Sequence, residues 1–128
     1  MAVYGEVVTF TAKAAADLSG VQYHIVRFSG ADTVNIASQD TSSEMCGVLQ
    51  NKPSAADQHA AVGFLGESKV VAGAAVSANA FITTNGSGRA VAATSGDMVC
   101  GRALEAASAD GEVIRCLLNP PFRWSGAV

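Results

Sequence analysis

The hydrophobic pattern along the chain is that of short β-strands separated by turns. Residues 3–14 alternate loosely between apolar and polar side chains, and residues 21–28 alternate in the same way. Such alternation places successive side chains on opposite faces of a strand. Turn residues follow roughly every 8 to 12 positions, which predicts an all-β fold. We expect a small β-barrel or a β-sandwich-like domain.

The two ends of the chain are predicted to differ in role from its middle. Residues 1–14 read as a first strand or as an extended N-terminal arm. Near the other end, Pro120 and Pro121 lack the backbone donor that a strand ladder needs. We therefore expect the ladder to end at Asn119 and residues 119–128 to form a C-terminal tail. The 128 residues are predicted to be a single β domain (1–128) with a core of its own.

Two stretches of the sequence are diverged copies of each other. Residues 41–65 and 94–118 both carry Thr-Ser, an acid, Met, Cys-Gly, a Leu followed by Gln or Glu, Ala-Asp and an apolar run. The offset is 53 residues at the methionines and 54 at the glycines, so one inserted residue relates the copies. The strands expected before each stretch also match. The sequence thus predicts two quasi-repeated β-motifs, at about 21–65 and 80–118, that close on each other.

Two further turns are predicted inside this framework. Asn85-Gly86 is typical of a tight primed hairpin turn, because these residues adopt the positive φ angles that it requires. Gly66-Glu67-Ser68 is a second expected turn, and it would place Lys69 at a hairpin. A lysine at a hairpin tip is the modified residue of biotinyl and lipoyl carrier domains. A small carrier or ligand-binding β-barrel that uses Lys69 is therefore one alternative function.

Charge narrows the classes of partner. Charged residues make up 15% of the chain, the net charge is −3, and the eight basic residues are scattered. Binding to a phosphate backbone needs clustered Lys and Arg, so we expect no nucleic-acid partner. No apolar run approaches the roughly 18 residues that span a membrane, and the start has no secretory signal pattern. We expect no membrane partner and synthesis in a reducing cytoplasm.

Residues that could carry chemistry are few. His24 and His59 have no acid or nucleophile at a recognisable spacing. The three cysteines form no C-x-x-C pair, and Cys46 and Cys100 occupy matching places in the two motifs. We interpret them, together with Cys116, as small buried hydrophobes rather than redox or metal groups. We predict no catalytic, cofactor-binding or metal-ligating residues, and no enzyme activity.

The second motif resembles a known family. The resemblance is carried by V-V-A-G-A-A-V from Val70, G-R-A-V-A-A-T-S-G-D from Gly88, and C-G-R-A-L-E-A-A-S-A-D-G-E-V-I-R-C-L-L from Cys100 to Leu118. These runs are similar to the capsid cement (head decoration) proteins of tailed bacteriophages. The resemblance implies a non-catalytic virion protein, made in the host bacterial cytoplasm, that binds the capsid exterior and stabilises the lattice of the major capsid protein. It also implies self-association, with a homotrimer first and a dimer second. Another virion module, of a tail or fibre, is a further alternative.

A protein of this kind needs an apolar contact surface rather than a pocket. Interface centres favour aromatic residues and are depleted in charge. Here the aromatics near the chain ends are Tyr4, Phe10, Phe122 and Trp124. We predict these four as capsid or subunit contacts, with the N-terminal segment adding a strand to a neighbouring edge. For Phe10 and Trp124, packing on the ends of the barrel is an equally weighted alternative.

Overall fold

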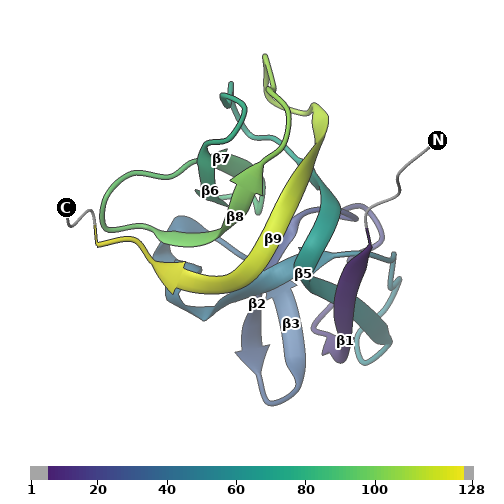
Figure 1. The fold of residues 1–128 in the computed structure, drawn as a ribbon. Coiled ribbons are helices and arrows are strands. Elements are labelled where there is room, and N and C mark those ends of the chain that lie inside the picture. The colour runs from purple at the N-terminus through teal and green to yellow at the C-terminus, as the bar shows by residue number, and fades with distance from the viewer. Residues whose placement is uncertain (1–5, 126–128) are drawn as a thin grey trace.

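The computed structural model describes residues 6–125 and places about half of them in the strands of one β-sheet (Figure 1). The nine strands are β1 (Val7–Ala14), β2 (Ile25–Gly30), β3 (Thr33–Ile36), β4 (Met45–Leu49), β5 (His59–Val71), β6 (Phe81–Thr84), β7 (Ala90–Ala92), β8 (Met98–Ala103) and β9 (Val113–Arg123). A short 3-10 helix, η1 (Gln39–Glu44), precedes β4, and the described residues contain no α-helix. The predicted all-β class is confirmed.

The first five strands close into a barrel. Their order is β1-β3-β2-β4-β5, and β1 also pairs with β5, from Val7 opposite Gly66 to Lys13 opposite His59. The inward side chains of these strands form one core cluster, which includes Ala12, Val26, Val34, Leu49 and Val62. From Val7 onward the N-terminal segment is therefore a barrel strand rather than an arm. Residues 1–5, and with them Tyr4, lie outside the described part.

The second motif repeats the arrangement of the first. The full strand order is β1-β3-β2-β4-β5-β9-β8-β6-β7, so β3-β2-β4-β5 and β7-β6-β8-β9 meet where β5 pairs with β9. A parallel bridge between Ala72 and Ala90 links the end of β5 to the start of β7. A second core cluster, with Ile25, Val48, Val70, Ile82 and Leu118 among its members, fills the space between the motifs. The two predicted quasi-repeats are confirmed.

One glycine in each motif lies against the backbone of the facing strand, and the two glycines occupy equivalent positions. A Cβ atom on Gly47 would lie 2.1 Å from the carbonyl oxygen of Gly63. A Cβ atom on Gly101 would lie 2.3 Å from the carbonyl oxygen of Leu117. Positions 63 and 117 differ by the same 54 residues as the two glycines. The repeated Cys-Gly pair is thus a steric requirement, because the facing strand backbone leaves no room for a side chain.

The turn predicted at Gly66-Glu67-Ser68 does not form. β5 continues through it as one strand of 13 residues. Gly66 pairs with Val7 of β1 and with Leu118 of β9, so a neighbouring strand is paired with β5 on each side of this position. Local turn preference is overridden here by pairing with segments distant in the sequence. The long strand β5 is consequently shared by both motifs.

Lys69 therefore does not lie at a hairpin tip. It lies within β5, opposite Arg115 of β9. Its Nζ atom is 5.7 Å from the ring centroid of Tyr23, a cation–π contact that holds the side chain against the sheet. The carrier interpretation depended on a protruding turn, and the structure removes that basis.

The predicted end of the ladder at Asn119 is also wrong. β9 runs through both prolines to Arg123. Its pairing with β8 passes from Leu118 to Phe122 through an irregularity in register, so Pro120 and Pro121 lie between the paired positions. A bulge tolerates proline because no ladder hydrogen bond is required there. The predicted tail thus begins as strand, and only residues 126–128 lie outside the described part.

Candidate functional site

Phe10 is the centre of one aromatic cluster. Its ring centroid lies 5.7 Å from that of Phe28 and 5.9 Å from that of Phe64. The three rings come from β1, β2 and β5, and Phe28 is 44% exposed. Together they line a shallow groove of about 290 Å³ whose other walls are Met45, Cys46, Pro120 and Pro121. We call this the apolar groove, since none of its lining side chains is charged.

Phe81 is the centre of a second aromatic cluster. Its ring meets Phe122 at 5.9 Å and Trp124 at 5.1 Å, both edge-on. The guanidinium of Arg102 lies over the same ring, 4.4 Å from the centroid. Phe122 is 40% exposed, whereas Phe81 and Trp124 are half-buried. Phe81, Arg102, Phe122 and Trp124 together form what we call the aromatic–arginine patch.

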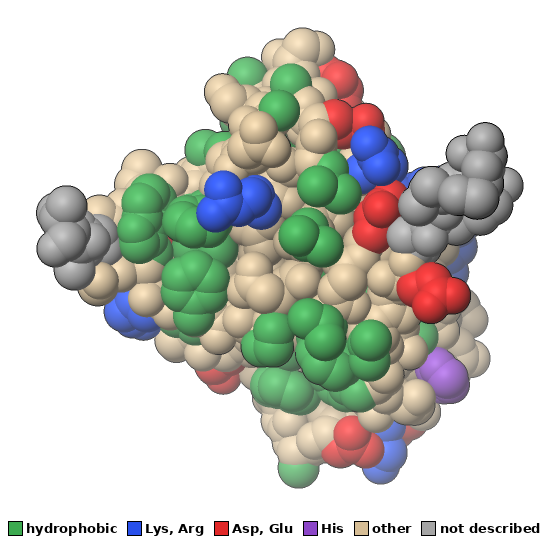
Figure 2. Space-filling model, viewed as in Figure 1, with side chains coloured by type: hydrophobic (Ala, Val, Ile, Leu, Met, Phe, Trp, Pro, Cys, Tyr) green, Lys and Arg blue, Asp and Glu red, His purple; other side chains and the backbone are tan. Residues whose placement is uncertain are grey.

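The two clusters are separate surfaces. Figure 2 shows two gatherings of hydrophobic side chains on one face, one near the end of β9 and one lower, over the barrel of the first motif. A basic side chain lies on the gathering near β9. The lower gathering has no comparable charge at its centre. Two hydrophobic surfaces, one with a basic side chain and one without, therefore lie on the same side of the molecule.

The residues predicted as contacts are divided between these surfaces. Phe10 belongs to the apolar groove, while Phe122 and Trp124 belong to the aromatic–arginine patch. Sequence reasoning missed the partners Phe28, Phe64 and Phe81, along with Arg102, because it concentrated on the chain ends. Strand pairing brings these partners together, and an alternating pattern alone does not specify it. Alternation did place Phe28 on one face of a predicted strand, which was the available signal.

The arginines of the molecule fall into two groups. Arg89 forms an ion pair with Asp110 (2.7 Å), and Arg115 with Glu67 (3.2 Å). Arg27, Arg102 and Arg123 instead donate to backbone carbonyl oxygens, those of Phe28 (3.4 Å), Asn79 (3.2 Å) and Gly96 (2.8 Å). Among the side chains that the structure describes, none of these three is within ion-pair distance of a carboxylate. Arg102, the arginine of the patch, therefore keeps an uncompensated positive charge.

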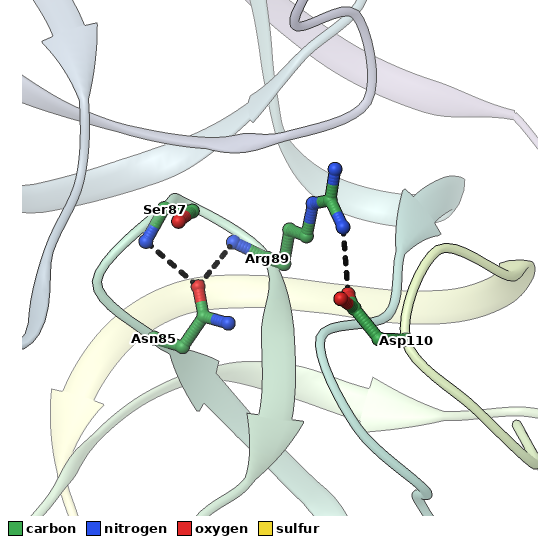
Figure 3. Close-up of polar contacts among 4 residues, drawn as sticks. All are labelled: Asn85, Ser87, Arg89 and Asp110. Carbon is green, nitrogen blue, oxygen red and sulfur yellow. Dashed lines mark hydrogen bonds and ion pairs between the residues drawn. The ribbon is translucent and has the colours of Figure 1, made fainter.

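The hairpin between β6 and β7 is held by a side chain rather than by the predicted primed turn. Oδ1 of Asn85 accepts hydrogen bonds from the backbone N–H groups of Ser87 (2.9 Å) and Arg89 (3.0 Å), as Figure 3 shows. The positive φ angle lies at Gly88 (74°), not at Asn85 or Gly86. The hairpin was predicted correctly and its turn type was not, because the Asn side chain imitates a backbone turn. Arg89 then points away from the loop, toward Asp110.

This hairpin also joins the two motifs. The carbonyl oxygen of Gly88 accepts a hydrogen bond of 2.6 Å from the backbone N–H of Ile25 in β2. Beside the contact lies a polar hollow of about 510 Å³, lined by residues of both motifs, among them His24, Asn35 and Arg89. At its wall, Nδ1 of His24 lies 3.2 Å from the carbonyl oxygen of Gln22. The hollow marks the junction of the motifs.

Comparison with known proteins shows a likeness of fold. No protein-family model and no curated protein sequence matches the chain. Among solved structures, the fold is similar to the N base of the head fibre protein gp8.5 of bacteriophage phi29, with a TM-score of 0.64. The likeness covers 89% of this chain and 95% of that one, at 22% identity. The shared property is the fold. The shared fold includes both motifs, since the likeness covers 89% of the chain.

The cysteine side chains are buried inside the described part of the protein. Cys46, Cys100 and Cys116 are buried and free. Burial raises the pKa of Cys46 and of Cys116 to about 12, and it also raises the pKa of Cys100, so all three thiols are protonated at neutral pH. In the described residues, no group of three or more His, Cys, Asp or Glu side chains is placed to hold a metal ion. No helix there has the length and apolar character that crossing a bilayer requires.

Proposed function

We propose that this chain is a structural, non-enzymatic module of a phage virion that binds the outside of the head and stabilises the lattice of the major capsid protein. The observation that carries the proposal is the likeness of its fold to the base of a phage head fibre, over 89% of the chain. The resemblance of the second motif to head decoration proteins points to the same class. A module of a head fibre is the second candidate, favoured by the same fold likeness.

The surface of the molecule supports this proposal physically. Monomeric proteins rarely expose large contiguous apolar patches, and those that do so usually bind a partner there. This chain exposes two aromatic clusters on one face (Figure 2). Trp, Phe and Arg are prominent in the centres of protein interfaces. We therefore assign this face to attachment, with Phe10, Phe122 and Trp124 among its contacts.

The proposal includes self-association, with a homotrimer first and a dimer second. Most oligomers of identical chains have closed rotational symmetry, and head-to-tail contacts close into rings such as trimers. A ring of three copies is the homotrimer that the family resemblance implies. The expected partners are accordingly the major capsid protein and further copies of this chain, without nucleic acid or membrane.

The test is co-sedimentation of the purified protein with undecorated heads of the phage that encodes it. We expect saturable binding by the wild-type protein, and weaker binding after Phe28→Ser or Phe122→Ser, which change exposed rings at the two surfaces. Val113→Ser is the matched control, because Val113 is 51% exposed and lies outside both clusters. Light scattering gives the mass of the free protein. Absence of the wild-type protein from sedimented heads at every concentration would overturn the proposal.

A further inference from the structure

We propose that the aromatic–arginine patch binds an acidic segment of a partner, one that carries a carboxylate beside an apolar side chain. The inference deepens the proposed function and rests on it, since the major capsid protein is the partner in question. It concerns the patch of Phe81, Arg102, Phe122 and Trp124, and it does not assign recognition of charge to the apolar groove.

The positive group of the patch is held by two contacts. Arg102 lies over Phe81 and donates from Nη1 to the carbonyl oxygen of Asn79. A guanidinium has five N–H donors, so donors beyond that one bond remain for a carboxylate. An arginine that is ordered before binding loses less conformational entropy when a partner arrives.

The charge of the patch is not neutralised by the protein itself. Arg89 and Arg115 have acidic partners, whereas no described carboxylate is within ion-pair distance of Arg102. The residues opposite Arg102 in the neighbouring strands are Phe81 and Leu117, and both are apolar. On a chain of net charge −3, this local positive surface is complementary to an acidic partner.

The aromatic half of the patch specifies more than charge. Phe122 is 40% exposed and, with Trp124, packs edge-on against Phe81. An inserted apolar side chain of the partner would bury these ring faces while its neighbouring carboxylate meets a guanidinium. A phosphate backbone offers only the charge, and one arginine provides few of the contacts it needs. The geometry therefore favours an acidic protein segment over nucleic acid.

Two variants with equal charge changes provide the test. Arg102→Glu reverses the charge of the patch, and Lys52→Glu makes the same change at an exposed lysine outside it. In the head co-sedimentation assay, we expect the arginine reversal to weaken binding at least about tenfold and the lysine reversal to change it little. Wild-type binding should weaken as salt rises from about 50 to about 500 mM. Arg102→Gln, which keeps similar size, should weaken binding less than the reversal.

A second assay separates this inference from the proposed function. The probe is an immobilised copolymer of Glu and Tyr, compared with poly-Glu and with double-stranded DNA. We expect the wild-type protein to bind the Glu–Tyr copolymer more tightly than the other two, and the arginine reversal to abolish that binding. Copolymer binding without head binding would support the patch and overturn the proposed function. Head binding that is unaffected by salt and by the arginine reversal would overturn the role of the patch and leave the proposed function standing. Tighter binding of the wild-type protein to DNA than to the Glu–Tyr copolymer would have the same meaning.

Discussion

At the scale of single residues, the closest steric limits lie at the two equivalent glycines. We predict that Gly47→Ala and Gly101→Ala each destabilise the fold by more than about 2 kcal/mol, because the new methyl group would overlap a strand carbonyl at 2.1 or 2.3 Å. Gly86→Ala is the control, since its Cβ would meet nothing within 4 Å and its φ is not positive. Urea unfolding measures the difference. Equal stability of all three variants would contradict the steric account.

The buried thiols give a second residue-scale prediction, on pH. Burial raises the folded-state pKa of Cys46 and Cys116 to about 12, above the value of about 8.5 for an unfolded chain. Between these values the unfolded chain loses thiol protons that the folded chain keeps. The free energy of unfolding should therefore fall as pH rises through this window, by up to about 1.4 kcal/mol per pH unit for each thiol. Below pH 8 the contribution is complete.

Thermal denaturation from neutral pH to about pH 10 tests this thiol effect. Lys and Tyr also titrate at high pH, so the slope of wild-type protein is compared with that of a Cys46→Ala/Cys116→Ala variant. The variant should lose less stability over the alkaline range, although it starts lower because two packed sulfur atoms are missing. Identical slopes would show that the thiols ionise as easily in the folded chain as in the unfolded one.

At the scale of elements, Asn85 determines the hairpin between β6 and β7. Asn85→Ala removes the acceptor for two backbone N–H groups, and we expect a loss of about 1 kcal/mol because one of them is only partly exposed. Asn85→Asp keeps an acceptor oxygen in the same place and should stay within about 0.5 kcal/mol of the wild type. Chemical denaturation compares the three. A larger loss for Asp than for Ala would contradict the turn account.

Sequence reasoning found the elements that depend on local signals. The repeated Cys-Gly pair and the matching hairpins were visible as spacing, and the structure places them in equivalent strands. It failed at Gly66 and at Pro120-Pro121, where residues typical of turns lie inside long strands. In both places the outcome depends on strands that approach from elsewhere in the chain. Such pairing leaves no local mark, so neither the continuous β5 nor the bulge in β9 could be predicted.

The candidate site divides in the same way. Phe10, Phe122 and Trp124 were identifiable because aromatic residues are scarce in this chain. Their assignment to two separate surfaces required the fold, since Phe81 reaches Trp124 only through the pairing of β6, β8 and β9. The uncompensated charge of Arg102 was likewise invisible, because the sequence does not show which arginines have acidic partners.

At the scale of the whole molecule, the shared strand β5 couples the two motifs. We predict a single cooperative unfolding transition, because opening either motif removes a partner from the strand on which the other depends. Trp124 reports on the second motif, while Gly47→Ala perturbs the first. The variant should shift the urea midpoint of tryptophan fluorescence and of far-UV circular dichroism equally. Separate midpoints would mean that the motifs unfold independently.

The position of the aromatic–arginine patch along the chain matters for anyone who wishes to attach a cargo to this protein. Trp124 comes shortly before the last residue, Val128, whereas β1 begins on the far side of the molecule (Figure 1). A fluorescent or antigenic domain attached at Ser125 would start beside Trp124 and crowd the patch. The same domain attached at the start of β1 would start away from it. For surface display the N-terminal end is the one to extend.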